Sequence, residues 1–270
     1  MTAAAHVKTL LKRFLPRPIS KGLARVYNKF KPLSINQPVT VYRNDDRAST
    51  VIGINNYYSW ILAGVPVKVK VRVDFYDPAG KRVLRHTVTL GEFASAGVDV
   101  RKVFAANNIS SEYGIFSVGI YPNASWRDEF RHMGNFTGVY FALFQYNDGS
   151  VGVVHPNSRL GDEQVEKRTW YSLQLIHTKG LNEVNLYHMH PADVTMDQTF
   201  ILYCPKTNRE FGRASIAMTP RSAHRIHFDL TNARDLPEFL QLRSTEMSPN
   251  NAKALLERVF ASGNSSISHS

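Results

Sequence analysis

Three histidines in this sequence have the type and spacing that could bind a metal. His188 and His190 are separated by one residue, and side chains two apart on a β-strand point to the same side. Two imidazoles on one face, joined by a third ligand such as His177, are suited to a divalent metal. Pro191 follows directly and marks a strand end, which favours the alternative that the pair is simply two polar terminal residues. Both interpretations stay open.

The His188-Met-His190 spacing partly resembles the first histidine motif of the cupins. It lacks the glutamate of that motif, and no second motif of the Gly-Pro-Gly…His type follows. The resemblance implies a metal-dependent enzyme on a cupin-like sandwich, which is one alternative function.

An aromatic and basic segment between residues 122 and 138 is the second candidate. Aromatic rings and arginines together can stack on and hydrogen-bond a sugar or a phosphate. The alternative is a solvated loop with one aromatic side chain in the core. The predicted ligand-binding residues are Tyr121, Trp126, Arg127 and Arg131.

Nucleophilic catalysis has weaker support in the sequence. Cys204 occupies a turn position that Asp77 matches in the first half of the chain, which indicates an ordinary turn residue. The sequence has no Gly-x-Ser-x-Gly elbow and no glycine-rich phosphate loop of standard spacing. We therefore predict no catalytic residue and no cofactor.

Alternating patterns predict the strands that would position these residues. From Val65 to Phe75, apolar residues alternate with polar ones, as on a strand with one face buried. Asp148-Gly149 between two apolar runs predicts a tight hairpin. The segment 251–260 is open to two interpretations, because its apolar spacing also fits a helical face. Further strands are predicted at residues 83–90, 114–121, 139–146, 150–155, 199–203 and 211–218.

The second half of the chain repeats features of the first in the same order. Tyr76-Asp-Pro78 and Tyr203-Cys-Pro205 each precede a polar turn and a strand. A closing block has glycine six residues before histidine in both halves, and a weaker pairing matches Asn55 and Tyr57 with Asn185 and Tyr187. A fixed order of matching features indicates a duplicated unit. The matched histidines, His155 and His269, are interpreted as framework residues at the sheet edge.

These patterns predict a mainly β protein of two tandem antiparallel β-sandwich units related by internal duplication. A short basic helical arm precedes them. The predicted boundaries are 1–37 for the amphipathic arm, 38–160 for the first unit, 161–167 for the linker and 168–270 for the second unit.

The positive charge of the chain is concentrated near its beginning. Of 33 Lys and Arg residues, nine precede residue 44, and no Asp or Glu precedes Asp45. Residues 44–270 therefore carry 24 basic residues against 22 acidic ones, a net charge of +2. Two short basic amphipathic helices in tandem are typical of segments that bind an anionic membrane surface. The predicted membrane-binding residues are Lys8, Lys12, Arg13, Phe14, Arg17, Lys21, Arg25 and Lys29.

Other interpretations of the arm remain open. Its apolar stripes are also suited to packing on the body, and its acid-free basic composition is shared by cleaved organellar presequences. Nucleic-acid binding is less favoured than packing or membrane binding, because phosphate contact needs clustered bases but not apolar patterning. A third possible function is that of a coat-like jelly-roll protein whose basic arm binds nucleic acid.

The arm sequence from Lys12 to Pro18, continuing to Lys31-Pro32, resembles the basic arms of bacterial proteins of surface-polysaccharide biosynthesis. The resemblance implies a cytoplasmic, peripheral membrane location near glycan assembly. The leading hypothesis is a non-enzymatic binding or scaffold protein held at a membrane surface. Its expected partners are the anionic membrane surface and a glycan or another protein.

Overall fold

The computed structural model describes residues 38–61, 67–122, 140–156, 158–160, 171–244 and 254–269. All of them belong to one compact unit, residues 36–270. The predicted arm and linker lie outside the described residues, as does most of the predicted loop at 122–138.

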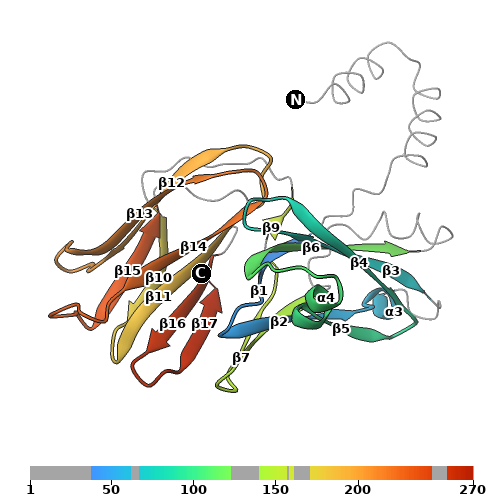
Figure 1. The fold of residues 1–270 in the computed structure, drawn as a ribbon, viewed down its shortest axis with the longest axis horizontal. Helices are drawn as coiled ribbons and strands as arrows, with labels where there is room; N and C mark the ends of the chain where they lie inside the picture. The colour runs from blue at the N-terminus through green and yellow to red at the C-terminus, as the bar shows by residue number, and fades with distance from the viewer. Residues whose placement is uncertain are drawn as a thin grey trace, which may run out of the picture. The chain divides into compact units, whose positions relative to one another are not determined.

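The first half of the described chain forms two antiparallel sheets (Figure 1). Their strand orders are β4-β3-β6-β1-β9 and β5-β2-β7-β8. The elements of this half are β1 (Pro38–Arg43), β2 (Ala48–Asn55), α3 (Tyr58–Ile61), β3 (Val69–Tyr76), β4 (Arg82–Leu90), β5 (Ser95–Asp99), α4 (Val100–Ala106), β6 (Tyr113–Pro122), β7 (Tyr140–Tyr146), β8 (Val151–Val154) and β9 (Ser158–Arg159).

The second half also forms two antiparallel sheets, coloured yellow to red in Figure 1. Their strand orders are β10-β15-β12-β13 and β14-β11-β16-β17. The strands are β10 (Tyr171–His177), β11 (Leu181–His190), β12 (Met196–Tyr203), β13 (Glu210–Met218), β14 (Ser222–Asp229), β15 (Phe239–Ser244), β16 (Leu255–Phe260) and β17 (Ser265–His269).

The two halves share one strand order. The sheet β4-β3-β6-β1 corresponds to β13-β12-β15-β10, and β5-β2-β7-β8 corresponds to β14-β11-β16-β17. The strands predicted from alternation are confirmed, and so is the mainly β character of the protein.

Matching irregularities support this correspondence. The β3–β4 ladder shifts register between Phe75 and Tyr76, and the β12–β13 ladder shifts between Leu202 and Tyr203. The closing hairpins turn at Gly149 (φ 85°) and Gly263 (φ 84°), where glycine avoids the strain that a side chain would bring. The tight hairpin predicted at Asp148-Gly149 is therefore confirmed, and the second half has a matching turn at Gly263.

The weaker pairing of Asn55 with Asn185 is wrong. Asn185 lies opposite Glu257, three residues before the end of β16, whereas Val51 lies opposite Leu143, three residues before the end of β7. The register therefore matches Asn185 with Val51. Two asparagines at similar distances from a repeated motif had coincided by chance.

Segment 251–260 contributes a strand, so the helical interpretation is wrong for residues 255–260. This strand, β16, pairs with β11 on one side and β17 on the other. Leu255, Leu256 and Val259 are all buried, because apolar clusters cover both faces of the strand. Burial on two faces removes the alternation by which a strand is normally recognised.

Apolar side chains fill the space between the paired sheets of each half. In the first half, Phe116 of β6 contacts Tyr140 of β7, with ring centroids 5.3 Å apart. Tyr42, Phe75 and Phe104 form a cluster of edge-to-face rings nearby. The second half has its own cluster, built mainly from leucine, isoleucine, valine and phenylalanine.

Candidate functional site

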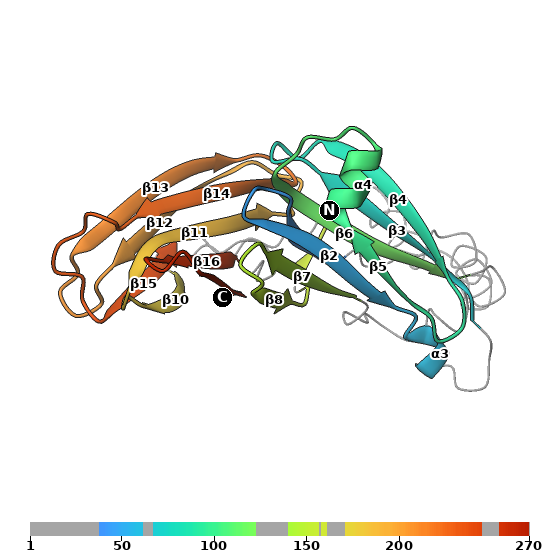
Figure 2. The same ribbon diagram turned by 60° about the horizontal axis from the view of Figure 1, so that its bottom comes forward.

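The two halves contact each other through one face of the sheet β14-β11-β16-β17. Along β11, Val184 and Leu186 belong to the core of the second half, whereas Tyr187 and Met189 belong to the apolar cluster of the first. Leu255 lies opposite Tyr187 and joins the same cluster. Figure 2 shows β8 beside the β16–β17 hairpin along this contact. We call the contact the junction.

Arg43, the last residue of β1, is the centre of the junction and is fully buried. Its Nε donates to Asp45 Oδ2 (2.8 Å) and its Nη2 to Asp45 Oδ1 (3.0 Å). Its Nη1 donates to Glu257 of the second half and to the Tyr146 hydroxyl. The guanidinium carbon also lies 4.7 Å from the ring centroid of Tyr187. One arginine thus contacts both halves.

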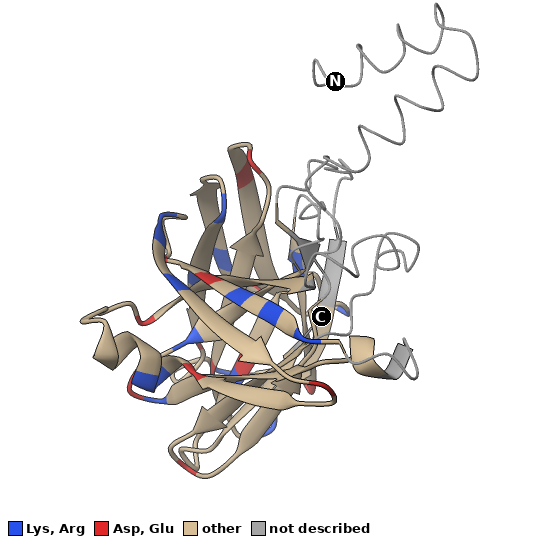
Figure 3. Cartoon of the chain, turned by 90° about the vertical axis from the view of Figure 1, so that its right-hand side faces the viewer, with Lys and Arg blue, Asp and Glu red and all other residues tan. Residues whose placement is uncertain are grey.

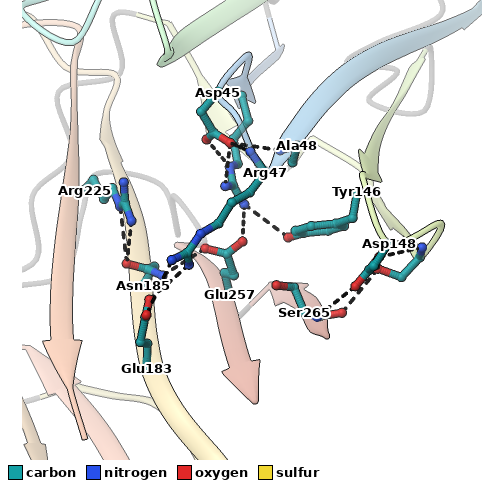
Figure 4. Close-up of polar contacts among 12 residues, drawn as sticks. Asp45, Arg47, Ala48, Tyr146, Asp148, Glu183, Asn185, Arg225, Glu257 and Ser265 are labelled. Atoms are coloured by element: carbon teal, nitrogen blue, oxygen red, sulfur yellow. Dashed lines mark hydrogen bonds and ion pairs between the residues drawn. The ribbon is translucent and has the colours of Figure 1, made fainter. Parts of the chain in front are cut away.

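Glu257 continues the network into the second half (Figure 4). Its Oε2 accepts from Asn185 Nδ2 (2.9 Å), and Asn185 Oδ1 accepts from His227 Nδ1 (3.0 Å). Arg225 donates to the same amide oxygen through Nε and Nη2, both at 3.2 Å. The buried carboxylate is therefore held by charged and polar donors, as a buried charge requires.

Contacts at the edge of the junction are more exposed. Arg47 Nη1 donates to Glu183 Oε2 (3.0 Å), and Asp148 Oδ2 accepts from the Ser265 amide (3.1 Å). Gly152 of β8 is so close to Ile267 of β17 that a Cβ atom there would lie 1.8 Å from the isoleucine Cγ2. Glycine permits this close approach.

The surroundings keep the buried groups in defined ionisation states. Burial alone would lower the pKa of Arg43, but Tyr187, Asp45 and Glu257 outweigh it and hold the pKa above its ordinary value. Burial, followed by the charge of Glu257, raises the pKa of Tyr146. Arg43 is therefore a permanent cation and Tyr146 a neutral hydroxyl.

The ion pair at the centre of the junction is sealed from solvent. The side chain of Arg43 is 1% exposed and that of Glu257 is 0% exposed. A substrate would have to separate the two halves to reach them. The chemistry of these groups therefore serves to fix the position of one half on the other.

Sequence reasoning missed this network. Arg43 had been counted with the basic residues before residue 44, and Glu257 lay in the segment with an ambiguous helical pattern. The available signal was a charged residue at the end of a mostly apolar segment, since Arg43 follows Val39-Thr-Val-Tyr42. That signal marks a buried charge but does not identify its partner.

The structure places His177 in a different sheet from the other two predicted metal ligands. His188 and His190 are buried within the second half, and the His188 ring contacts Phe200 with centroids 5.0 Å apart. His177 lies on β10 in the opposite sheet, where it is exposed and contacts Phe239. Among the described residues, no group of three or more His, Cys, Asp or Glu side chains is placed to hold a metal ion.

A histidine that the sequence analysis did not select lies beside this pair. His224 of β14 is directly opposite His188. Burial lowers the pKa of His188 to about 3, and the neighbouring His190 and His224 lower it as well. His190 Nε2 donates to the Val194 carbonyl (2.6 Å). The lowered pKa values keep His188 and His190 neutral at pH 7, and both side chains are buried.

Tyr121 is the described member of the predicted ligand-binding group. It lies on β6, and the guanidinium carbon of Arg72 is 4.6 Å from its ring centroid. Arg72 Nη1 also donates to its hydroxyl (3.4 Å). An aromatic-basic pair is thus present on this sheet. The other predicted members, and all the predicted membrane-binding residues, lie outside the described residues: Trp126, Arg127 and Arg131, and Lys8, Lys12, Arg13, Phe14, Arg17, Lys21, Arg25 and Lys29.

Cys204 is a turn residue, as predicted. Its amide donates to the Arg209 carbonyl (2.8 Å), as the Asp77 amide donates to the Lys81 carbonyl (2.9 Å) in the matching turn. The thiol is buried against the core of the second half.

The fold defines a mainly β protein with four antiparallel sheets and two halves of equal strand order. Neither family models nor curated proteins give a match to the chain.

Proposed function

We propose that this chain is a non-enzymatic binding or scaffold protein, made of two β-sandwich units that arose by internal duplication. The single observation that carries the proposal is a contrast in exposure. Arg43 and Glu257, the ion pair at the centre of the junction, are buried, whereas apolar side chains on one sheet face are exposed to solvent.

The exposed surface is the outer face of β2, β7 and β8, which we call the apolar sheet face. Val151 is 58% exposed, Val153 57% and Phe141 37%. Val51 and Leu143 lie opposite each other on the same face and are half-buried. Contiguous apolar surface of this kind costs free energy in water and marks interaction sites.

Attachment to a membrane is the second part of the proposal. Figure 3 shows basic and acidic residues interspersed over the described ribbon, so the body offers no one-sided positive charge in this view. The proposed attachment therefore rests on the basic arm. Among the described residues, no helix has the length and apolar character needed to cross a bilayer. An arm of basic amphipathic segments would place the body at a cytoplasmic anionic surface, where the resemblance to surface-polysaccharide proteins implies a glycan or protein partner.

Flotation of the full-length protein with vesicles tests this attachment. We expect it to float with vesicles containing phosphatidylserine and not with phosphatidylcholine alone, because each cation near an anionic surface contributes about 1 kcal/mol. Neutralising four arm cations should reduce binding by about tenfold or more. The substitutions are Lys8→Gln, Lys12→Gln, Arg13→Gln and Arg17→Gln.

A matched variant neutralises four exposed cations of the body and should float like the unmodified protein. Its substitutions are Lys68→Gln, Lys70→Gln, Lys81→Gln and Lys102→Gln. Equal flotation of the two variants would refute attachment through the arm.

A further inference from the structure

The junction is asymmetric, since it joins different surfaces of two units with the same strand order. The first half contributes the end of β1 together with β6 and β8, and the second half contributes the outer face of β14-β11-β16-β17. Each surface therefore has a counterpart on the other half that the junction does not use. Contacts of this head-to-tail kind can continue from one molecule to the next.

The apolar sheet face is the counterpart of the covered face of the second half. The register matches Val51 with Asn185 and Leu143 with Glu257. Val153, opposite Leu143, matches Ile267, opposite Glu257. Val51, Leu143 and Val153 therefore form a row on the apolar sheet face, where Asn185, Glu257 and Ile267 form the matching row at the junction.

The end of β10 is the counterpart of the end of β1. Arg43 lies opposite Tyr113 in the first half, and His177 lies opposite Phe239 in the second. Phe260, the last residue of β16, matches Tyr146, the last residue of β7.

The same correspondence matches Val41, which is 1% exposed, with Leu175, which is 54% exposed. His177 is exposed, while Phe239 and Phe260 are half-buried. We call these four residues the β10 end: Leu175, His177, Phe239 and Phe260.

The two counterparts that the junction does not use both differ from the junction surfaces in their central residues. The junction pairs a cation, Arg43, with an anion, Glu257, whereas the exposed counterparts carry His177 and Leu143. Two tyrosines of the junction are replaced by phenylalanines at the β10 end. At the junction, the end that carries Arg43 meets the face that carries its counter-charge, Glu257. The β10 end is mainly apolar and is complementary in the same way to the apolar sheet face.

We propose that copies of this chain associate head to tail, with the β10 end of one molecule on the apolar sheet face of the next. The contact repeats the geometry of the internal junction with His177 and Leu143 in place of the ion pair. This inference rests on the proposed binding function and identifies its partner as a second copy. Because the joined surfaces differ, each added molecule presents a new face for another.

Sedimentation of the full-length protein over a range of concentrations tests the proposal. The unmodified chain should increase in mass beyond a dimer as concentration rises. Leu143→Glu alters the face and Leu175→Glu alters the end, and each variant alone should remain a monomer. Thr87→Glu places the same charge at an exposed position of β4 and should associate like the unmodified protein.

Mixing the two deficient variants gives the sharper result. Leu143→Glu keeps an intact end and Leu175→Glu keeps an intact face, so an equimolar mixture should form a heterodimer that grows no further. Near-ultraviolet circular dichroism establishes that both variants are folded. A monomeric unmodified protein, or a mixture that stays monomeric, overturns the proposal, and so does a dimer that only one variant dissociates.

Flotation separates this inference from the proposed function. Leu143→Glu should bind anionic vesicles through the arm even though it does not self-associate. If the arm variant no longer floats but still self-associates, the result would support both the membrane attachment and the head-to-tail association. Unchanged flotation of the arm variant would refute the membrane attachment and leave the mass measurements to decide the association.

Discussion

Replacing Arg43 with methionine tests whether the junction network holds the two halves together. The substitution leaves Glu257 buried at 0% side-chain exposure, with the Asn185 amide still donating to it at 2.9 Å. Removing one partner of a buried ion pair costs about 3 to 5 kcal/mol, because the remaining charge loses its compensation. Asp45 keeps the backbone amides of Arg47 and Ala48 as donors, both at 2.9 Å, and adds little to this cost.

The double variant Arg43→Met with Glu257→Leu removes both charges. Leucine suits this strand position, since Leu143 occupies its counterpart in the first half. The remaining cost is the unpaired Asn185 amide, about 1 to 3 kcal/mol. The double variant should therefore be more stable than Arg43→Met alone.

Equilibrium unfolding in urea measures these differences as shifts in the midpoint at constant slope. For a body of this size, 3 to 5 kcal/mol corresponds to a decrease in Tm of roughly 6 to 20 °C. Arg47→Met is the control, because its pair with Glu183 has side chains 37% and 22% exposed and should contribute about 1 kcal/mol or less. The reasoning fails if Arg43→Met and Arg47→Met lower the free energy of unfolding equally. It also fails if the double variant loses as much free energy of unfolding as its two single substitutions added together.

Three further predictions concern packing, acid stability and helix capping. Gly152→Val should destabilise the protein by about 1 to 3 kcal/mol in urea unfolding through its clash with Ile267; Gly91→Val, with nothing within 4 Å of its Cβ position, should cost less, and equal costs would exclude the clash. The pKa of His188 is depressed to about 3 in the folded state, so its contribution is present above pH 6.5 and is lost as pH falls from 6.5 toward 3, when the unfolded chain binds the proton. His188→Gln should flatten the fall in the free energy of unfolding over that range, and an unchanged pH profile would contradict the assignment. Asp99→Ala removes the N-cap of α4 and should cost about 1 kcal/mol in the same unfolding assay, so a cost near zero would show that the cap contributes nothing.

Local patterns predicted the strands and turns of this fold because their causes are local. Alternation from Val65 to Phe75 predicts a strand with one face in the core. The burial of β3 alternates in this way from Val69 to Val73, whereas Asp74 beyond it is buried as well. Asp148-Gly149 encodes a turn that needs a positive φ at the glycine, which is 85°. A repeated order of such signals then predicts a repeated strand order.

The junction was out of reach of the same reasoning. Arg43 and Glu257 are 214 residues apart, and no periodicity connects positions so distant. The last seven residues of β11 are buried on both faces of the strand. His188 and His190 therefore do not lie on a solvent-exposed face. Metal binding and a polar strand end both stay open for these histidines at the level of sequence, because the sequence does not show which faces of a strand are covered.

The distance between Arg43 and Glu257 along the chain also has a consequence for synthesis. A ribosome adding about 5 to 20 residues per second makes Glu257 about 10 to 40 s after Arg43, given the 214 residues between them. During that interval Arg43 and the apolar side chains around it are not yet covered by the second half. Nascent chains stalled within this interval should recruit chaperones more strongly than chains stalled after β17 has left the exit tunnel.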